Sequence, residues 1–257
     1  MEIVLTIAGS DPSGGAGIQQ DLRTIESLGC YGASVITALT TQNTLGVQSV
    51  MPVPADVVKS QLEAVLSDLD VKAIKIGQIP SAEVAHAIAE TLSHHLTPIT
   101  HHPVILDPVM ISTSGRRLMS EDAIDIVVSE LFPLCTLITP NIPEMETLSG
   151  LSGFNAGNYN LLIKGGHAEG SEMADRLCLA NGTERVYTTE KINSTNLHGT
   201  GCALSSAIAS SLALGYSLED AVARGKDYVT KAIRGGRDLG VGHGNGPVFY
   251  KRIDNNE

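Results

Sequence analysis

Apolar and polar residues follow one another along the chain in blocks that predict strands and helices in turn. Six short apolar runs have the length of buried strands. These runs are Ile3–Ala8, Ala33–Thr40, Ala73–Gly77, Val104–Asp107, Leu137–Thr139 and Leu161–His167. Apolar residues at helical spacing predict helices between them, at Ile18–Leu28, Ala55–Leu69, Ala82–Leu96 and Glu121–Leu131. This alternation predicts an α/β fold with a mostly parallel sheet and helices on both faces.

Several further segments complete the pattern. Gly46–Val53 predicts a short, more exposed strand, and Leu177–Leu179 with Arg185–Thr189 predict an antiparallel pair. Two helices, Cys202–Leu214 and Leu218–Ile233, precede a glycine-rich tail. No linker, repeat or low-complexity tract interrupts the pattern, so we expect residues 1–257 to form one domain.

The stretch between Leu148 and Leu161 does not fit the alternation. It is rich in glycine and asparagine at the place where a crossover helix is expected. Parallel strands need about a dozen or more connecting residues, usually with a helix. Either the helix has been lost or a stretch of the native chain is missing from the sequence, and we favour the second explanation.

The composition narrows the class of protein. The net charge of −11 argues against nucleic acid as a partner, because phosphate binding needs clustered lysine and arginine. No apolar run is long enough to span a bilayer, and the N-terminus lacks the basic region of a signal peptide. The four cysteines include no Cys-x-x-Cys pair, which favours reduced thiols. We therefore expect a cytoplasmic protein that binds neither nucleic acid nor membrane.

The strongest candidate for a binding or reactive site is the loop that precedes the predicted helix Cys202–Leu214. Gly199 and Gly201 bracket Thr200, Cys202 follows, and an apolar helical pattern begins there. The glycines permit a tight turn, and the four N–H groups from Thr200 to Ala203 then lack helical partners at the positive end of the helix dipole. This predicts an anion pocket with Cys202 at its mouth. The alternative is a glycine-rich turn that only caps a helix.

Polar residues follow the predicted strands at their carboxyl ends. They are Asp11, Gln42, Gln78, Asp107, Asn141, Glu144, Lys164 and finally Cys202. Ligands bind at that edge of open α/β sheets. Asp107 and Glu144 are candidates for holding Mg²⁺, and the alternative is that Glu144 caps a helix while Asp107 is solvated in a loop. Lys164 ends a buried strand, where a lone cation is costly, so we expect a phosphate partner for it.

Other histidines and cysteines have a weaker claim to chemistry. The pairs His94-His95 and His101-His102 lack the ligand spacing of a metal site. His198 lies beside the glycine loop within reach of the ligand, and we favour stabilisation of the turn by packing over a contact with the ligand. Unreactive core thiols are expected at the cysteines in apolar settings, Cys30, Cys135 and Cys178.

Six motifs in order along the chain resemble one enzyme family. They are Ala8–Gln19, Thr37–Thr44, Asp107–Met110, Thr139–Glu144, Lys164–His167 and His198–Cys202. Together they resemble the hydroxymethylpyrimidine/phosphomethylpyrimidine kinases of thiamine biosynthesis, which are ribokinase-like. The resemblance implies a three-layer fold, usually in a homodimer. It also implies two phosphorylations by ATP with Mg²⁺, first of the substrate's hydroxymethyl group and then of the monophosphate.

The resemblance implies a substrate side for the site. Gln42 would hydrogen-bond the aminopyrimidine edge, and Gly9 and Val109 would line the ring pocket. Asp11 and Gln78 would lie on the same side. The family usually has methionine at the position of Gln78, where it packs on the pyrimidine, so this polar amide is a departure from the family pattern.

The resemblance also implies a nucleotide side. Lys164 would meet the phosphates of ATP, Asn141 and Glu144 would serve the region of Mg²⁺ and phosphate, and Asp107 would lie near the metal. The segment Gly199–Cys202 would form the anion hole. Cys202 would stand where most ribokinase-like sugar kinases have an aspartate base.

Two other functions compete with this interpretation. A pyridoxal/pyridoxine kinase would share the Gly-Thr-Gly-Cys motif and phosphorylate a hydroxymethyl group on a pyridine. A non-catalytic binding or regulatory module is the rival from a different class. Lys164, Glu144 and Cys202 together argue against that module, because a pure binder has no need of phosphate-binding and base groups together.

Overall fold

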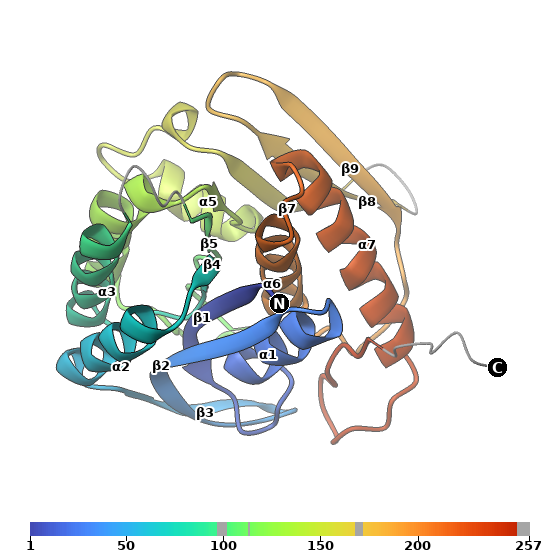
Figure 1. Ribbon diagram of the computed structural model, residues 1–257. Coiled ribbons are helices and arrows are strands. Elements are labelled where there is room, and N and C mark those ends of the chain that lie inside the picture. Colours follow the sequence, from blue (N-terminus) through green and yellow to red (C-terminus); the bar gives the residue numbers. More distant parts are fainter. Residues whose placement is uncertain (97–101, 113, 168–171, 251–257) are drawn as a thin grey trace.

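The computed structural model describes residues 1–96, 102–112, 114–167 and 172–250. Its sheet has nine strands in the order β3-β2-β1-β4-β5-β6-β7-β8-β9 (Figure 1). The strands are β1 (Ile3–Ser10), β2 (Tyr31–Asn43), β3 (Gly46–Pro52), β4 (Val71–Ile76), β5 (Val104–Leu106), β6 (Leu137–Ile138), β7 (Leu161–His167), β8 (Glu172–Cys178) and β9 (Glu184–Glu190). Strands β2, β1, β4, β5, β6 and β7 are parallel, and β3, β8 and β9 are antiparallel at the two edges. The predicted mostly parallel sheet is confirmed.

Helices cover both faces of the sheet, as predicted. They are α1 (Gly17–Ser27), α2 (Ala55–Asp68), α3 (Ala82–His95), α4 (Glu121–Ile126), α5 (Ile142–Ser149), α6 (Thr200–Ala213) and α7 (Leu218–Gly236). Helices α1, α6 and α7 share one core with the sheet, and α2, α3, α4 and α5 share the other (Figure 1). None of these helices, within the described ranges, is long and apolar enough to cross a membrane.

The two cores explain why the central strands are apolar almost throughout. In β1, Leu5 and Ile7 pack toward α2 and α3, whereas Val4 packs toward α1 and α6. In β5, Leu106 packs into the core shared with α2 and α3, and Ile105 packs into the core shared with α1 and α6. Successive side chains of a strand point to opposite faces, so a strand covered on both sides is apolar at every position.

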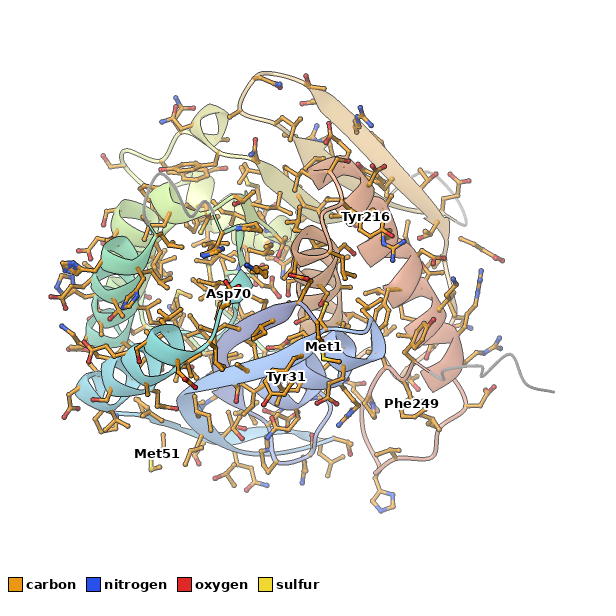
Figure 2. The ribbon with its side chains drawn as sticks, in the orientation of Figure 1. Met1, Tyr31, Met51, Asp70, Tyr216 and Phe249 are labelled. Carbon is orange, nitrogen blue, oxygen red and sulfur yellow. The ribbon has the colours of Figure 1, made fainter. Side chains whose placement is uncertain are left out.

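Strand β2 is longer than predicted and forms a hairpin with β3. It continues through Thr41, Gln42 and Asn43, which pair with Ser49, Val47 and Gly46 across the hairpin. Pairing with β3 satisfies the backbone groups of these polar residues, so they need not lie in a loop. The hairpin leaves large apolar side chains at the surface, among them Tyr31 and Met51 (Figure 2).

Helix α5 explains why the stretch between Leu148 and Leu161 contains no crossover helix. It lies between the parallel strands β6 and β7 in the chain and packs on the sheet, so α5 is the crossover helix. The expectation of another helix in that stretch is therefore wrong. Instead the connection contains a short 3₁₀ turn, and Phe154 stacks on Tyr159 with ring centroids 5.9 Å apart. That a stretch of native chain is missing there stays a prediction.

Candidate active site

A cavity of about 500 Å³ lies where the carboxyl ends of the parallel strands meet the N-termini of α1 and α6. Every residue predicted to bind or to react lines it: Gly9, Asp11, Gln42, Gln78, Asp107, Val109, Asn141, Glu144, Lys164, Gly199, Thr200, Gly201 and Cys202. Parallel strands bring these residues together because their carboxyl ends share one edge of the sheet.

Lys164 and Asp107 form an ion pair in this cavity. Lys164 Nζ lies 2.5 Å from Asp107 Oδ1, and the hydroxyl of Thr139 donates to the same oxygen at 3.2 Å. Asp107 is buried rather than solvated in a loop. Burial acts to lower the pKa of the Lys164 ammonium, but the carboxylates of Asp107 and Glu144 outweigh it and raise that pKa. Lys164 is therefore a charged group facing the cavity, with 16% of its side chain exposed.

Glu144 begins α5 as part of a capping box with Asn141. The backbone N–H of Glu144 donates to the Asn141 side chain at 2.9 Å, and the Asn141 N–H donates to Glu144 Oε2 at 2.8 Å. The alternative that Glu144 caps a helix is thus observed. Burial raises the pKa of this carboxyl to about 7, while Lys164 acts to lower it. A carboxyl with such a pKa changes charge near neutral pH, which is typical of functional sites.

The glycine loop begins α6 with a left-handed residue. Gly199 has φ +84°, and a Cβ there would lie 1.9 Å from the carbonyl oxygen of Gly15, so only glycine fits. The Ala203 N–H donates to Gly199 O at 2.9 Å, and the Thr200 N–H contacts Leu197 O at 3.3 Å.

These bonds correct the prediction that four free N–H groups point at an anion. Two of the four already have carbonyl partners within the turn. The N–H groups of Gly201 and Cys202 have no backbone partner among the described residues outside the helix, and these two face the cavity end of α6. An anion pocket at this terminus therefore rests on two donors and the dipole.

Cys202 lies between two helix N-termini. The backbone N–H of Gly17, at the start of α1, is near enough to lower the pKa of its thiol, which is itself in the first turn of α6. Burial raises the pKa of the thiol to about 11, although the ammonium of Lys75 and the Gly17 N–H act in the opposite direction. In the free protein Cys202 is therefore a thiol at neutral pH.

Gly9 and Gln78 form one wall of the cavity. A Cβ at Gly9 would lie 2.1 Å from Gln78 Oε1, so the absence of a side chain at Gly9 makes room for the amide. The hydroxyl of Thr37 donates to the backbone oxygen of Gln78 at 2.6 Å. The side-chain nitrogen of Gln78 is buried and has no partner among the described residues. Gln78 thus belongs to the cavity, as predicted.

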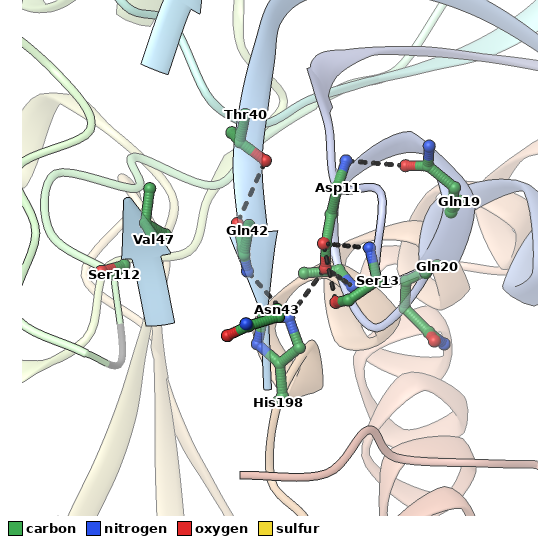
Figure 3. Close-up of polar contacts among 12 residues, drawn as sticks. Asp11, Ser13, Gln19, Gln20, Thr40, Gln42, Asn43, Val47, Ser112 and His198 are labelled. Atoms are coloured by element: carbon green, nitrogen blue, oxygen red, sulfur yellow. Dashed lines mark hydrogen bonds and ion pairs between the residues drawn. The ribbon is translucent and has the colours of Figure 1, made fainter. Parts of the chain in front are cut away.

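Gln42, His198 and Asp11 are joined in a polar network that connects three separate segments (Figure 3). His198 Nε2 lies 2.8 Å from Asp11 Oδ2 and 3.1 Å from the Gln42 amide. Burial acts to raise the pKa of Asp11, but hydrogen bonds from His198 and Ser13 outweigh it and lower the pKa. His198 therefore does more than stabilise the turn by packing, because its ring contacts two predicted substrate-binding residues.

A second lysine and aspartate, which the sequence predictions do not include, lie near Cys202. Lys75 of β4 and Asp21 of α1 form a fully buried ion pair with a distance of 2.7 Å. Asp21 also accepts hydrogen bonds from Thr6 at 2.6 Å and from Ser206 at 2.8 Å. Their signal was available, since a lysine interrupts an apolar strand and an aspartate lies on the apolar face of a predicted helix.

The side chains of His94, His95 and His102 do not line the cavity, and neither do the three cysteines other than Cys202. His101 is outside the described residues, and within the described ranges no three His, Cys, Asp or Glu residues form a metal-binding group. Burial raises the pKa of the thiols of Cys30, Cys135 and Cys178, and none of them lines the cavity. A protonated thiol is a poor nucleophile.

Comparisons with known proteins agree with this geometry. A family model described as phosphomethylpyrimidine kinase matches residues 11–249. The hydroxymethylpyrimidine/phosphomethylpyrimidine kinase of Rhizobium meliloti is 44% identical over 96% of each chain. The crystal structure of phosphomethylpyrimidine kinase from Clostridium difficile 630 is 41% identical, with a TM-score of 0.75 over 91% of this chain and all of that one.

The structure is also similar to pyridoxal kinases. The pyridoxal kinase of Staphylococcus aureus in complex with AMP-PCP and pyridoxal has a TM-score of 0.83 and 32% identity, over 98% of this chain and 96% of that one. The pyridoxal kinases are thus more distant in sequence than the pyrimidine kinases, although their fold is as similar. These findings confirm the resemblance, the three-layer fold and a phosphotransferase. The chain belongs to the phosphomethylpyrimidine kinase family.

Proposed function

We propose that this protein transfers the γ-phosphoryl group of ATP to 4-amino-5-hydroxymethyl-2-methylpyrimidine and then to its monophosphate, in thiamine biosynthesis. The observation that carries the proposal is the shared cavity. It holds a side-chain amide that can read a ring edge, Gln42, and an anion site at Gly201 and Lys164. Cys202 lines the same cavity in the first turn of α6, where a hydroxyl group would meet the phosphate.

The nucleotide side is built for negative charge. Lys164 would leave Asp107 for the phosphates of ATP, and Asn141 lies beside it, since the two residues pair as an isolated bridge. Asp107 and Glu144 would hold Mg²⁺ together with phosphate oxygens and water, because Mg²⁺ is usually bound through one or two carboxylates. The donor set fits, since Asp107 Oδ2 makes no hydrogen bond with a described residue. Bound Mg²⁺ would neutralise phosphate charge.

Cys202 is the proposed base of the first phosphorylation. As the hydroxymethyl oxygen bonds to the γ-phosphorus, its proton passes to the sulfur of the Cys202 thiolate. The bond from phosphorus to the bridging oxygen breaks, and ADP leaves. The second phosphorylation needs less help, because the attacking phosphate oxygen is already ionised. Phosphoryl transfer depends mainly on positioning and charge, with a modest contribution from a base.

Cys202→Ala tests this role. We expect kcat of the first phosphorylation to fall about 10²–10⁴-fold and that of the second to fall less. Because the thiol has a pKa of about 11 and acts only when deprotonated, the wild-type kcat of the first step should rise with pH between about pH 7 and 10. Cys178→Ala, outside the cavity, is the matched control. Equal losses in both steps would mean that Cys202 only shapes the anion hole.

Pyridoxal phosphorylation is the alternative activity, and the fold similarity to pyridoxal kinases favours testing it. Parallel ATPase-coupled assays with the pyrimidine and with pyridoxal decide between the two. A higher kcat/KM for pyridoxal would overturn the proposal. No ADP release with either substrate would favour the binding module.

A homodimer in the cytoplasm completes the proposal. The exposed side chains of Leu39 and Met51 pair across β2 and β3, which gives the subunit an apolar face to cover. The four cysteines are free thiols, as expected in a reducing compartment. Sedimentation equilibrium of the wild type and of Met51→Lys tests the dimer, and an unchanged monomer mass in both would contradict it.

A further inference from the structure

We propose that His198 is a positioning residue that fixes the orientation of the Gln42 side-chain amide. By doing so it decides where the cavity offers a hydrogen-bond donor and where it offers an acceptor to the substrate ring. The inference rests on the proposed function, because it names the ring edge that this site reads. It starts from the number of hydrogens that the donors of the network in Figure 3 can supply.

His198 Nε2 has two neighbours but can hold only one hydrogen. Asp11 Oδ2 lies 2.8 Å away and the Gln42 amide 3.1 Å away. Asp11 is an ionised acceptor, since it accepts the Ser13 N–H, the Ser13 hydroxyl and the Ala16 N–H. The imidazole must therefore donate from Nε2, and it cannot at the same place accept from an amide NH₂ group. The end of the Gln42 amide next to His198 is consequently its oxygen, so the amide is turned over relative to Figure 3, which draws its nitrogen toward His198 and its oxygen toward Thr40.

The contacts of Thr40 at the other end of the amide predict the same orientation of the Gln42 side chain. Its hydroxyl lies 3.0 Å from the backbone oxygen of Ser10 and 3.3 Å from the other end of the Gln42 amide. The single hydroxyl hydrogen goes to Ser10 O, which can only accept. Thr40 Oγ1 is then an acceptor for Gln42, so that end of the amide is its NH₂ group. The two ends of an amide are nearly the same size, and the hydrogen-bond partners decide between them.

This orientation leaves a defined pair of groups for the substrate. The Gln42 oxygen shares the single Nε2 hydrogen of His198 with Asp11 and keeps a lone pair for the substrate, and its nitrogen keeps one hydrogen after donating to Thr40. A matching ring edge has an amino donor beside a ring-nitrogen acceptor, as in a 4-aminopyrimidine. The 4-oxo analogue has the reverse order, because its carbonyl accepts and its ring N–H donates. Gln42 alone, free to turn over, would accept both.

The network is anchored on every side. The backbone N–H of His198 donates to Gly246 O, and its carbonyl accepts from the Val248 N–H, both at 3.1 Å. Asp11 is held in its turn by the bonds from Ser13 and Ala16. Gly199 follows His198 directly, so the residue that orients the Gln42 amide immediately precedes the glycine loop of the predicted anion pocket.

The experiment compares two substrates that differ only in that edge. The ratio of kcat/KM for the amino substrate to kcat/KM for its 4-oxo analogue is measured for the wild type, His198→Ala and His198→Gln. We expect the ratio to fall about 10- to 100-fold in His198→Ala, because only the longer contact with Thr40, at 3.3 Å, then holds the amide in one orientation. His198→Gln keeps an N–H near the position of Nε2 and should restore most of the ratio. General damage to the site lowers both rates together, so an unchanged ratio in His198→Ala would overturn the inference.

A second measurement does not depend on turnover. ¹⁵N NMR of the imidazole ring in the free protein identifies the nitrogen that carries the proton. We expect a proton on Nε2 of His198, and an unprotonated Nε2 would overturn the inference whatever the substrate. Absence of phosphorylation of the pyrimidine by the wild type would instead refute the proposed function, with the ring proton still deciding the orientation of Gln42.

Discussion

Two lysine–aspartate pairs lie within the same region of the molecule and differ in their surroundings. The enclosed pair, Lys75 and Asp21, is 0% exposed on both side chains, with a separation of 2.7 Å. The cavity pair, Lys164 and Asp107, has 16% and 2% of its side chains exposed. The enclosed pair has further hydroxyl donors on its carboxylate, and the cavity pair has a third ionisable group, Glu144, beside it.

The difference separates structural from functional charge. A buried charge is tolerated when its partners satisfy it completely, and it is costly when one partner leaves. Asp21 is satisfied by Lys75, Thr6 and Ser206, so nothing is gained by moving any of them. Lys164 can reach the cavity, so a phosphate can replace Asp107 as its partner. We therefore expect loss of stability from breaking the enclosed pair and loss of activity from breaking the cavity pair.

Asp21→Asn should have the largest effect of all on stability. It leaves the Lys75 ammonium buried without a counter-charge, and removal of one member of a buried pair costs about 3–5 kcal/mol. Urea denaturation at neutral pH measures the free energy of unfolding. Asp227→Asn is the control, because Asp227 forms an exposed ion pair with Lys231 at 2.7 Å and should change little. Equal results for the two variants would show that the enclosed pair is not a structural element.

The residues of the cavity pair were predictable from the sequence, whereas for the enclosed pair the sequence shows two charged residues in apolar settings but not their contact, for a physical reason. Asp107 directly follows strand β5 and Lys164 lies within β7, and both strands have a visible apolar run, so the parallel topology brings the two residues to one edge of the sheet. Asp21 and Lys75 lie inside elements, 54 residues apart, and their contact depends on how α1 packs against β4 and α6. Periodicity finds elements but not which faces meet.

The same limit applies to the ring side of the site. The motif that contains Gln42 indicates a binding residue, whereas nothing in the sequence connects His198 with its partner Asp11, which is 187 residues away. For the crossover helix the sequence prediction fails in a different way. Helix α5 is short, and its first residues were read as part of the site and not as the connection between β6 and β7.

Lys164→Met should produce the opposite pattern to Asp21→Asn. We expect kcat/KM for ATP to fall about 10²–10³-fold, as when one charge-stabilising donor is removed from an active site. The free energy of unfolding should fall less than in Asp21→Asn, because Asp107 keeps Thr139 as a donor and faces the cavity. Lys59→Met, which breaks only an exposed ion pair with Glu90, is the activity control. A larger loss of stability than of activity would reverse the assignment of the two pairs.

Glu144 makes the cavity pair sensitive to pH. Its pKa is raised to about 7 in the folded protein, so between its unfolded value of about 4.3 and 7 folding takes up a proton. Stability contributed by this group is therefore present at low pH and is lost as the pH rises through that window. We expect the stability of Glu144→Gln relative to the wild type to increase by about 1–3 kcal/mol from pH 4.5 to 7.5. Glu146→Gln, its exposed neighbour on α5, should show no such trend.

Two glycines allow a finer test, because each lies against one of the pairs. A Cβ at Gly77 would lie 2.6 Å from Lys75 Nζ and 3.1 Å from Ala8 Cβ. A Cβ at Gly201 would lie 2.9 Å from Asp107 Oδ2 and 3.5 Å from Lys164 Nζ. Gly77→Ala therefore crowds the enclosed pair, and Gly201→Ala crowds the cavity pair.

The two variants should separate stability from activity with the smallest change that the chain permits. Gly77→Ala should lower the free energy of unfolding by about 1–3 kcal/mol, since the enclosed lysine has no room to move. Gly201→Ala should leave stability nearly unchanged, because alanine in a helix gains up to about 1 kcal/mol over glycine and Lys164 can shift into the cavity. Its kcat/KM for ATP should nevertheless fall about tenfold, because the methyl group lies between the free N–H groups and Asp107. If both variants lose stability alike, the two pairs are equally enclosed and the distinction between them is wrong.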